Sequence, residues 1–425
     1  MSFQRKLIIV ALASALPMAS AFAQSASDLK AEIEALKAQL MKLQKQVEAV
    51  VEKSEPTATS QQISRLEQRL DLADDNAEAS GFKGMVVKGV VEAAYIRDTV
   101  GETDQFAARS GNGGNAMIEL TKETDGGDGV NWTLRLEPNG ANLVHEATVS
   151  APLFEGTRIY GGIIPDFQGY EYAWSHLNPL LTHNALFDLA GPTAYEGMGL
   201  THTLTDEVTM KWMVGNIDRG NDDGLGLKPT AGWAYRFDWA ISEYAFVGLS
   251  GAHSGSQRKF NVVAIDGGYL RGDWMFNAHL NFGDLEGGAY NGGNATWTGL
   301  SGLVGYKLTP RLNLIARADY ISNRDNGGGT YVTNFLNNPL DAAMSDPTGG
   351  TGLGPELDAS GAVIDANVGA NLTRISLGTN YLLNPTTQWK TEVRLDQSSG
   401  NNFTSDGVNF KKDNITIGTS FVVAF

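Results

Sequence analysis

The segment from residue 165 to residue 191 gathers ionisable side chains and contains no lysine or arginine. Its members are Asp166, Glu171, Asp188, His176 and His183. Carboxylates that line a narrow, wet passage can select and orient ions, because they are less screened there than on an open surface. Histidines also ligate metals, but these two stand seven residues apart with no carboxylate motif beside them. We therefore expect neither a metal nor a cofactor.

Basic side chains recur along the rest of the chain at positions that would face this acidic segment. They are Lys88, Arg135, Arg158, Lys211, Arg236, Arg317, Arg374 and Arg394. An acidic segment opposite a basic wall would set a transverse field across a narrow pore. For any single arginine, a salt bridge to a neighbour on the wall is an equally good interpretation. The sign of ion selectivity therefore stays open.

The acidic segment is also too apolar for a loop that hangs in water. Its aromatic and aliphatic residues include Tyr170, Tyr172, Trp174, Leu180, Leu181, Leu186 and Phe187. An exposed loop has little reason to carry so many apolar side chains, whereas a loop packed on a wall does. The sequence therefore predicts that this segment lies against the structure that surrounds it.

From residue 82 onward, apolar residues alternate with polar ones. Trp274, Phe276, Ala278 and Leu280 show the pattern. A period of two fits strands that have one apolar and one wet face. We predict about sixteen strands, near 82–96, 116–124, 130–137, 143–151, 157–164, 192–203, 206–216, 229–241, 243–252, 260–270, 272–283, 295–308, 311–322, 367–382, 386–397 and 413–425.

The connections between the predicted strands alternate in length. Tight turns at 203–206, 241–243, 270–272, 308–311 and 382–386 alternate with long segments rich in glycine, asparagine and aspartate. Outer-membrane barrels have short periplasmic turns and long external loops, whereas a soluble sandwich has no reason to alternate in this way. We predict an all-β fold in which residues 82–425 form an antiparallel transmembrane barrel of about sixteen strands. Tryptophans at 132, 233, 239, 274, 297 and 389 would suit its interfacial girdles.

Composition excludes several classes of function. The chain has 32 Lys and Arg against 48 Asp and Glu, a net charge of −16, which argues against binding to nucleic acid. It has no cysteine, so disulfides, thiolate metal sites and a cysteine nucleophile are excluded. The sequence contains no Walker loop, no GxSxG elbow and no HExxH helix. We therefore do not expect an enzyme.

Residues 1–23 resemble a secretory signal peptide. Arg5 and Lys6 precede an apolar run over 7–18 and a small-x-small cleavage site at 21–23. Removing this segment deletes two positive charges and takes the net charge from −16 to −18. No later stretch approaches the ~20 apolar residues of a transmembrane helix. If the mature protein lies in a membrane, it must do so as a closed barrel.

Residues 24–55 carry the heptad pattern of a coiled coil. Its seam consists of Leu29, Ile33, Leu36, Leu40, Leu43, Val47 and Val50. So narrow an apolar stripe implies association with other helices, and Pro56 stops the helix because proline lacks the backbone donor. The alternative is a helix packed on the protein's own body. Residues 56–81 are predicted to form a second short helix and a linker.

Three short motifs carry a resemblance to a known family. They are GGIIPDFQGYEY at 161–172, GPTAYEG at 191–197 and VGN at 214–216. They resemble the OmpL-like β-barrel porins over roughly residues 158–250. The layout of a coiled coil before a barrel is similar to phosphate- and dicarboxylate-type porins that assemble as trimers with a periplasmic stalk. The loops lack the dense lysines of phosphate-selective porins, which argues against phosphate selectivity.

The resemblance implies an outer-membrane porin that passes small hydrophilic solutes passively. Many sixteen-stranded porins fold the loop after the fifth strand into the lumen, and here that loop is 165–191. We expect a homotrimer in the outer membrane of a Gram-negative bacterium, with its coiled coil in the periplasm. Its expected partners are membrane lipids, lipopolysaccharide and, through Phe425, the barrel assembly machinery. The alternatives are a structural or tethering barrel that is not a channel, and an outer-membrane lipid-modifying enzyme.

Overall fold

A computed structural model describes residues 84–100, 104–107, 116–124, 129–138, 143–192, 194–217, 231–255, 259–331 and 351–425. The predicted signal peptide, coiled coil and linker, at 1–23, 24–55 and 56–81, lie outside the described residues. Among the residues that are described, no helix is both long enough and apolar enough to cross a membrane.

The described chain is almost entirely β-structure. Its only named helical elements are η2 (Ser175–Leu177) and α4 (Ala185–Leu189). The strands are β1 (Met85–Asp98), β2 (Asp104–Ala107), β3 (Ala116–Lys122), β4 (Asn131–Leu136), β5 (Val144–Phe154), β6 (Thr157–Pro165), β7 (Ala194–Thr203), β8 (Val208–Asn216), β9 (Ala231–Ser242), β10 (Ala245–Ser254), β11 (Phe260–Arg271), β12 (Trp274–Leu285), β13 (Ala295–Thr309), β14 (Leu312–Ser322), β15 (Leu372–Asn384), β16 (Thr387–Ser398) and β17 (Asp413–Ala424).

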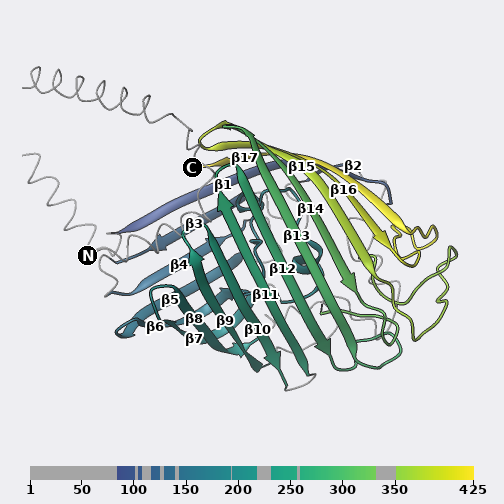
Figure 1. The fold of residues 1–425 in the computed structure, drawn as a ribbon, viewed down its shortest axis with the longest axis horizontal. Helices are drawn as coiled ribbons and strands as arrows, with labels where there is room; N and C mark the ends of the chain where they lie inside the picture. Colours follow the sequence, from purple (N-terminus) through teal and green to yellow (C-terminus); the bar gives the residue numbers. More distant parts are fainter. Residues whose placement is uncertain are drawn as a thin grey trace, which may run out of the picture. The chain divides into compact units, whose positions relative to one another are not determined.

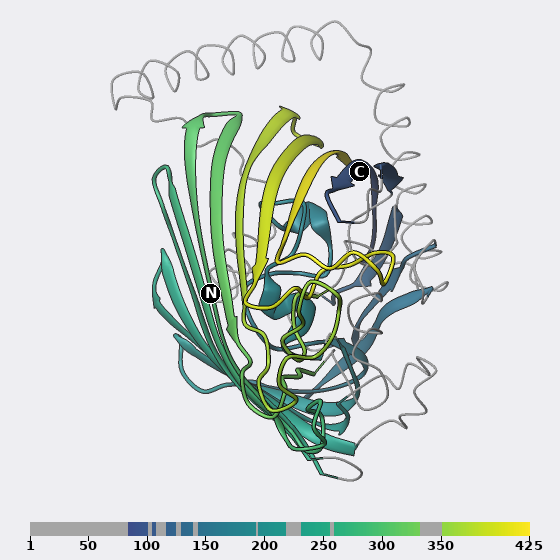
Figure 2. The same ribbon diagram turned by 90° about the vertical axis from the view of Figure 1, so that its right-hand side faces the viewer.

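Consecutive strands pair antiparallel and the sheet closes on itself (Figures 1 and 2). Closure joins β1 to β17, with Val91 opposite Val423, and the backbones of Gly89 and Phe425 exchange two hydrogen bonds of 2.8 and 2.9 Å. The four-residue β2 also pairs with β1. The prediction of an antiparallel barrel of about sixteen strands is confirmed, with β2 as a short addition between the strands predicted near 82–96 and 116–124.

The alternation along the strands separates an outward apolar face from an inward polar face. Trp233, Trp239, Trp274 and Trp389 lie outward and exposed, as the girdle interpretation requires. Trp297 does not, since only 3% of its surface is exposed and its Nε1 donates to Asn281 Oδ1 at 2.8 Å. Its place on the inward face of β13 corrects the assignment of this residue to a girdle.

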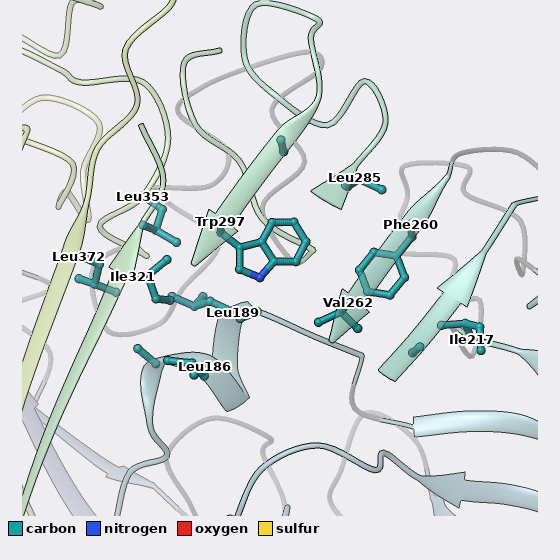
Figure 3. Packing of buried hydrophobic residues seen from close by; sticks show 14 of the residues in the cluster. Leu186, Leu189, Ile217, Phe260, Val262, Leu285, Trp297, Ile321, Leu353 and Leu372 are labelled. Atoms are coloured by element: carbon teal, nitrogen blue, oxygen red, sulfur yellow. The ribbon is translucent and has the colours of Figure 1, made fainter. Parts of the chain in front are cut away.

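Part of the inward face is itself apolar. Figure 3 shows Trp297, Phe260 and Val262 from the wall close to Leu186 and Leu189 from α4. The same buried cluster continues into the external loops, where it includes Leu353 and Phe403. Burial of apolar surface is the main favourable contribution to packing, so this cluster fixes α4 against the wall.

Candidate functional site

The connection between β6 and β7 runs inside the barrel. In Figure 2 its teal trace, with a short helix, lies within the ring of strands. The helix is α4, and the side chain of Asn184 caps it by accepting a hydrogen bond from Phe187 N at 2.8 Å. We call residues 165–191 the lumen loop. Its polar contacts with the wall form four groups.

The first group centres on Arg317 of β14, which is fully buried. Its Nη1 donates to Glu171 Oε1 at 2.9 Å and to the carbonyl of Thr182 at 2.7 Å. Its Nη2 donates to the carbonyl of His183 at 2.7 Å, and its Nε lies 3.2 Å from Asp319 Oδ2. One guanidinium therefore holds three separate points of the loop, using the fork of donors that only arginine offers.

The second group centres on Arg374 of β15. Its Nη1 donates to Asp188 Oδ2 at 2.7 Å, and its Nε donates to Asp396 Oδ1 at 2.7 Å. Arg394 binds the other oxygen of Asp396 at 2.8 Å. Asp188 is therefore neutralised by Arg374 of the wall. Within the loop, the ring of His183 stacks on Phe187, with the centroids 4.3 Å apart.

The third group holds the backbone of the loop through β16. Glu392 accepts hydrogen bonds from Leu181 N at 2.9 Å and from Thr182 N at 2.7 Å. Two residues earlier, Lys390 donates from Nζ to the carbonyl of Asn178 at 2.5 Å. Because alternate residues of a strand face the same side, Lys390 and Glu392 reach the loop as neighbours.

The fourth group holds the first part of the loop. Arg236 donates to the carbonyl of Phe167 at 2.6 Å and to both oxygens of Asp266 at 2.8 Å. Gln168 accepts from Asn281 at 2.8 Å, and the hydroxyl of Tyr170 lies 2.6 Å from that of Ser301. Asp166 accepts a hydrogen bond from the backbone of Gln168 within the loop.

An apolar contact covers the opposite side of the loop. Trp174 and Leu177 pack on Val90, Met117 and Val422, which lie on the inward faces of β1, β3 and β17. Leu181 packs on Ala94 and Ile96 of β1. These contacts explain the apolar residues that the sequence places in the loop.

Among the described residues, none of the four remaining predicted wall residues has a hydrogen bond to the lumen loop, and they do not form one network. Lys88 Nζ lies 3.2 Å from Glu119, and Arg135 binds both Glu119 and Glu146. Arg158 donates to the carbonyl of Gly129 at 2.8 Å. Lys211 of β8 stands opposite Arg236 of β9 in the ladder. Of the basic residues predicted to face the loop, the structure thus brings Arg236, Arg317 and Arg374 to it, and it pairs Lys88 and Arg135 with other strands.

Several residues that hold the loop were absent from the predicted site. Asp319, Lys390 and Glu392 lie on the parity predicted to face the lumen, so their orientation was available from the alternation. Their position along the barrel axis could not be predicted from the alternation, because it depends on the register of strands far apart in the chain. His176 lies in η2 and is half-buried, and it takes no part in the four groups of contacts.

Burial shifts the acid–base behaviour of the loop carboxylates. It raises the pKa of Asp166 to about 7, and it raises the pKa of Glu171 to about 7 despite the attraction of Arg317. Burial opposes ionisation of Asp188 as well, but Arg374 and His183 outweigh it and the pKa of Asp188 is lowered. No group of three or more metal-binding side chains occurs among the described residues.

These shifts predict that acid favours the docked loop. A docked Glu171 or Asp166 keeps its proton up to about pH 7, whereas a released loop in water loses it near its ordinary pKa of 4.5 or 3.8. Docking therefore strengthens as the pH falls from about 7 towards the ordinary values, and it weakens as the pH rises through that window. Current noise from loop release should be greater at about pH 8 than at about pH 5. The double variant Glu171→Gln, Asp166→Asn should show no such dependence, and an unchanged dependence would contradict this assignment.

A turn at Gly169 sets how closely the loop approaches the wall. Its φ of +76° suits glycine, and a Cβ there would lie 2.9 Å from Nδ1 of His279 on β12. We expect Gly169→Val to displace the loop and to raise current noise. Gly272→Val is the matched control, because Gly272 also has a positive φ, +63°, but no atom within 4 Å of its Cβ position. Equal effects of the two variants would mean that backbone strain alone is responsible.

Solved outer-membrane proteins share this fold at low sequence identity. The outer membrane channel DcaP of Acinetobacter baumannii is 11% identical, with a TM-score of 0.51 over 80% of this chain and 97% of that chain. An anion-selective porin from Comamonas acidovorans is 10% identical, with a TM-score of 0.50 over 80% and 99%. OmpT of Vibrio cholerae in a trimer form is 11% identical, with a TM-score of 0.50 over 80% and 99%. None of the curated proteins matches the sequence.

A family model matches nearly the whole barrel. It is described as "Putative beta-barrel porin-2, OmpL-like" and it covers residues 95–425. This range contains the lumen loop and sixteen of the seventeen strands in full. The chain belongs to the family of OmpL-like β-barrel porins of the outer membrane.

Proposed function

We propose that small hydrophilic solutes cross the barrel passively, through a water-filled passage that the lumen loop narrows. The observation that carries this proposal is the loop's attachment to the wall, through β9, β12 to β17, β1 and β3. Within the lumen, Trp174 also packs on His145 of β5, with the ring centroids 4.5 Å apart, and Phe167 packs on Tyr195 of β7 at 5.2 Å. The loop therefore contacts the wall on several sides. In this proposal Asp166, Glu171 and Asp188 hold the loop in place and do not form a ring of free charge.

The ion pairs of Lys88 and Arg135 present cations more than anions, whereas in the pair of Arg236 and Asp238 the carboxylate is the more exposed partner, 35% against 12%. The side chain of Lys88 is 60% exposed and that of Arg135 is 26% exposed, whereas Glu119 and Glu146 are each 10% exposed. Solutes therefore meet the positive ends of these ion pairs first. We propose a modest preference for anions, to which Arg158 and Lys211 contribute.

Single-channel recording in asymmetric salt tests both proposals. We expect a steady conductance with a reversal potential on the anion side. Replacing Lys88 and Arg135 with Gln should move the reversal potential towards cations. Arg311→Gln is the matched control, because it removes an exposed positive charge at the β13–β14 turn. A cation-selective wild type, or equal shifts in both variants, would contradict the proposed wall.

The same recording, together with a lipid-hydrolysis assay, distinguishes a porin from the two alternative functions. A structural or tethering barrel would show no conductance, and a lipid-modifying enzyme would release products from phospholipid vesicles. We propose that the protein catalyses nothing and needs no cofactor. Vesicle hydrolysis that survives purification would overturn that part of the proposal.

The finer parts of assembly and placement are proposals as well. We propose a homotrimer whose 24–55 coiled coils associate in the periplasm after removal of residues 1–23. Acidic external loops would bind lipopolysaccharide through divalent cations. The last strand, ending in Phe425, would be the element that the barrel assembly machinery recognises.

A further inference from the structure

A small cavity lies between the first part of the lumen loop and the wall at β12. The wall contributes His279, and the loop contributes Asp166, Gln168, Gly169, Glu171, Asn184, Leu186, Phe187 and Gly191. About 10 Å³ of its space is open to the centre of a water-sized sphere. One water molecule needs about that much room, and any larger ligand needs more.

His279 is the polar group that the wall brings to this cavity. It is 3% exposed, and neither nitrogen of its ring has a hydrogen-bond partner among the described residues. Its neighbours in the ladder are Asp266 and Ser301. Both are engaged elsewhere, because Asp266 accepts from Arg236 with its two oxygens and Ser301 donates to Asp319. A buried donor or acceptor without a partner is unfavourable, and a neutral imidazole has one of each.

The loop brings a matching donor and acceptor to the same cavity. Gln168 is 7% exposed, and its Oε1 accepts from Asn281 at 2.8 Å. Its Nε2 has no hydrogen-bond partner among the described residues. Asp166 accepts from the backbone of Gln168 with Oδ1, and no hydrogen bond within the described residues uses its Oδ2. Three side chains that line the cavity therefore have hydrogen-bonding capacity that the described protein does not use.

The chemistry of the cavity suits a neutral ligand better than a metal ion. Glu171 also lines it, but Arg317 and the backbone N–H of Asn184 already bind its two oxygens. No group of three or more metal-binding side chains occurs among the described residues. A water molecule, by contrast, can donate two hydrogen bonds and accept two, and buried waters typically make about three.

We propose that one water molecule is bound in this cavity and links the lumen loop to β12. It accepts a hydrogen bond from Gln168 Nε2, and it also hydrogen-bonds to a ring nitrogen of His279 and to Oδ2 of Asp166. Because water both donates and accepts, it serves His279 whichever ring nitrogen carries the proton. The water is then a structural component of the docked loop, in addition to the direct contacts that Arg236 and Ser301 make.

Two glycines of the loop leave the space for this water. A Cβ at Gly169 would lie 2.9 Å from His279 Nδ1, and a Cβ at Gly191 would lie 3.0 Å from Gln168 Nε2. Gly169 has a positive φ, so its backbone also favours glycine. Gly191 is not among the residues with a positive φ, so a methyl group there changes the cavity without straining the backbone.

Two substitutions of nearly equal size test the site in the full-length protein. His279→Leu and His279→Asn both shorten the side chain, but only asparagine can hydrogen-bond to a water. Gly191→Ala fills the cavity from the side of the loop. Gly302→Ala is its matched control, because no atom lies within 4 Å of the Cβ position of Gly302. Crystal structures locate the ordered water, and single-channel recording counts the large openings that follow release of the loop.

In the wild type we expect a water within ~3.2 Å of a His279 ring nitrogen and of Gln168 Nε2. His279→Asn and Gly302→Ala should keep it. His279→Leu and Gly191→Ala should lose it, and their large openings should become roughly tenfold more frequent, because buried polar groups are left without a partner. The inference is overturned if the wild-type cavity holds no water, if the water survives His279→Leu, or if the two His279 variants open equally often. The electron density does not depend on conduction, so a bound water in a barrel that conducts nothing would uphold this inference and refute only the proposed porin function.

Discussion

Deleting residues 170–186 is expected to raise the single-channel conductance several-fold. This stretch supplies most of the contacts to β14, β15 and β16, as well as the apolar contact with β1, β3 and β17. Without it, the part of the lumen that this stretch occupies fills with water. Larger sugars should then pass in a liposome-swelling assay, because this stretch no longer narrows the lumen.

The barrel should survive this deletion. Its strands pair in a closed ladder, and the exposed charges of Arg317, Arg374 and Glu392 would be solvated by the wider lumen. Unheated and boiled samples should migrate differently on a gel, and this difference would show that the ladder of strands remains closed. The control is deletion of 405–409, an exposed tip of the last external loop, which should leave conductance as it is. Unchanged conductance in the 170–186 deletion would place the lumen loop outside the conducting path.

The second large effect is expected from Arg317→Met. The change removes the guanidinium that binds both Glu171 and the carbonyl of Thr182, and it leaves the carbonyl of His183 with Arg374, whose Nη1 donates to it at 3.1 Å. It leaves Glu171, Asp319 and Glu392 buried close to one another without their shared cation. Removing one partner of a buried ion pair costs roughly 3–5 kcal/mol. A loss of that size should release the loop and give frequent openings to a larger conductance.

A double-mutant cycle separates the ion pair from a general packing defect. Glu171→Gln removes one of the carboxylates that Arg317→Met leaves without a cation. The effect of the double variant should therefore be smaller than the sum of the effects of the two single variants. Arg317→Lys should restore the docking of the loop only in part, because a lysine ammonium cannot bind all the acceptors that the planar guanidinium binds. The readouts are the frequency of large openings and the temperature at which the unheated gel band is lost. Strict additivity would mean that Arg317 and Glu171 do not act as a pair.

The strands were predictable because each carries its own signal. The predicted span 295–308 corresponds to β13 (Ala295–Thr309), and 260–270 corresponds to β11 (Phe260–Arg271). Period-two alternation is local, so each strand can be found without knowing its neighbours. The exceptions are equally local. The four residues of β2 are too few to show a period, and β15 begins at Leu372 rather than 367.

The partners of the lumen loop were not predictable to the same degree. Its place after the fifth strand, its charge and its apolar residues are all visible in the sequence. The identity of Arg317, Lys390 and Glu392 as its anchors depends on the stagger of strands around the whole ring, which no single strand encodes. Trp297 shows the same limit. Its aromatic type suits a membrane girdle, but the facing α4 gives it an apolar environment inside the lumen.

The anchors of the lumen loop have a consequence for the order in which the protein is built. Adjacent strands are joined by local pairing, but Glu171 and Arg317 are 146 residues apart, and Leu181 and Glu392 are 211 apart. Contacts between such distant residues form late, since the intervening chain must first be ordered. The loop cannot reach its anchors until β14, β15 and β16 have joined the ring. During biogenesis the lumen is therefore not narrowed by the loop until the last quarter of the chain has joined the sheet.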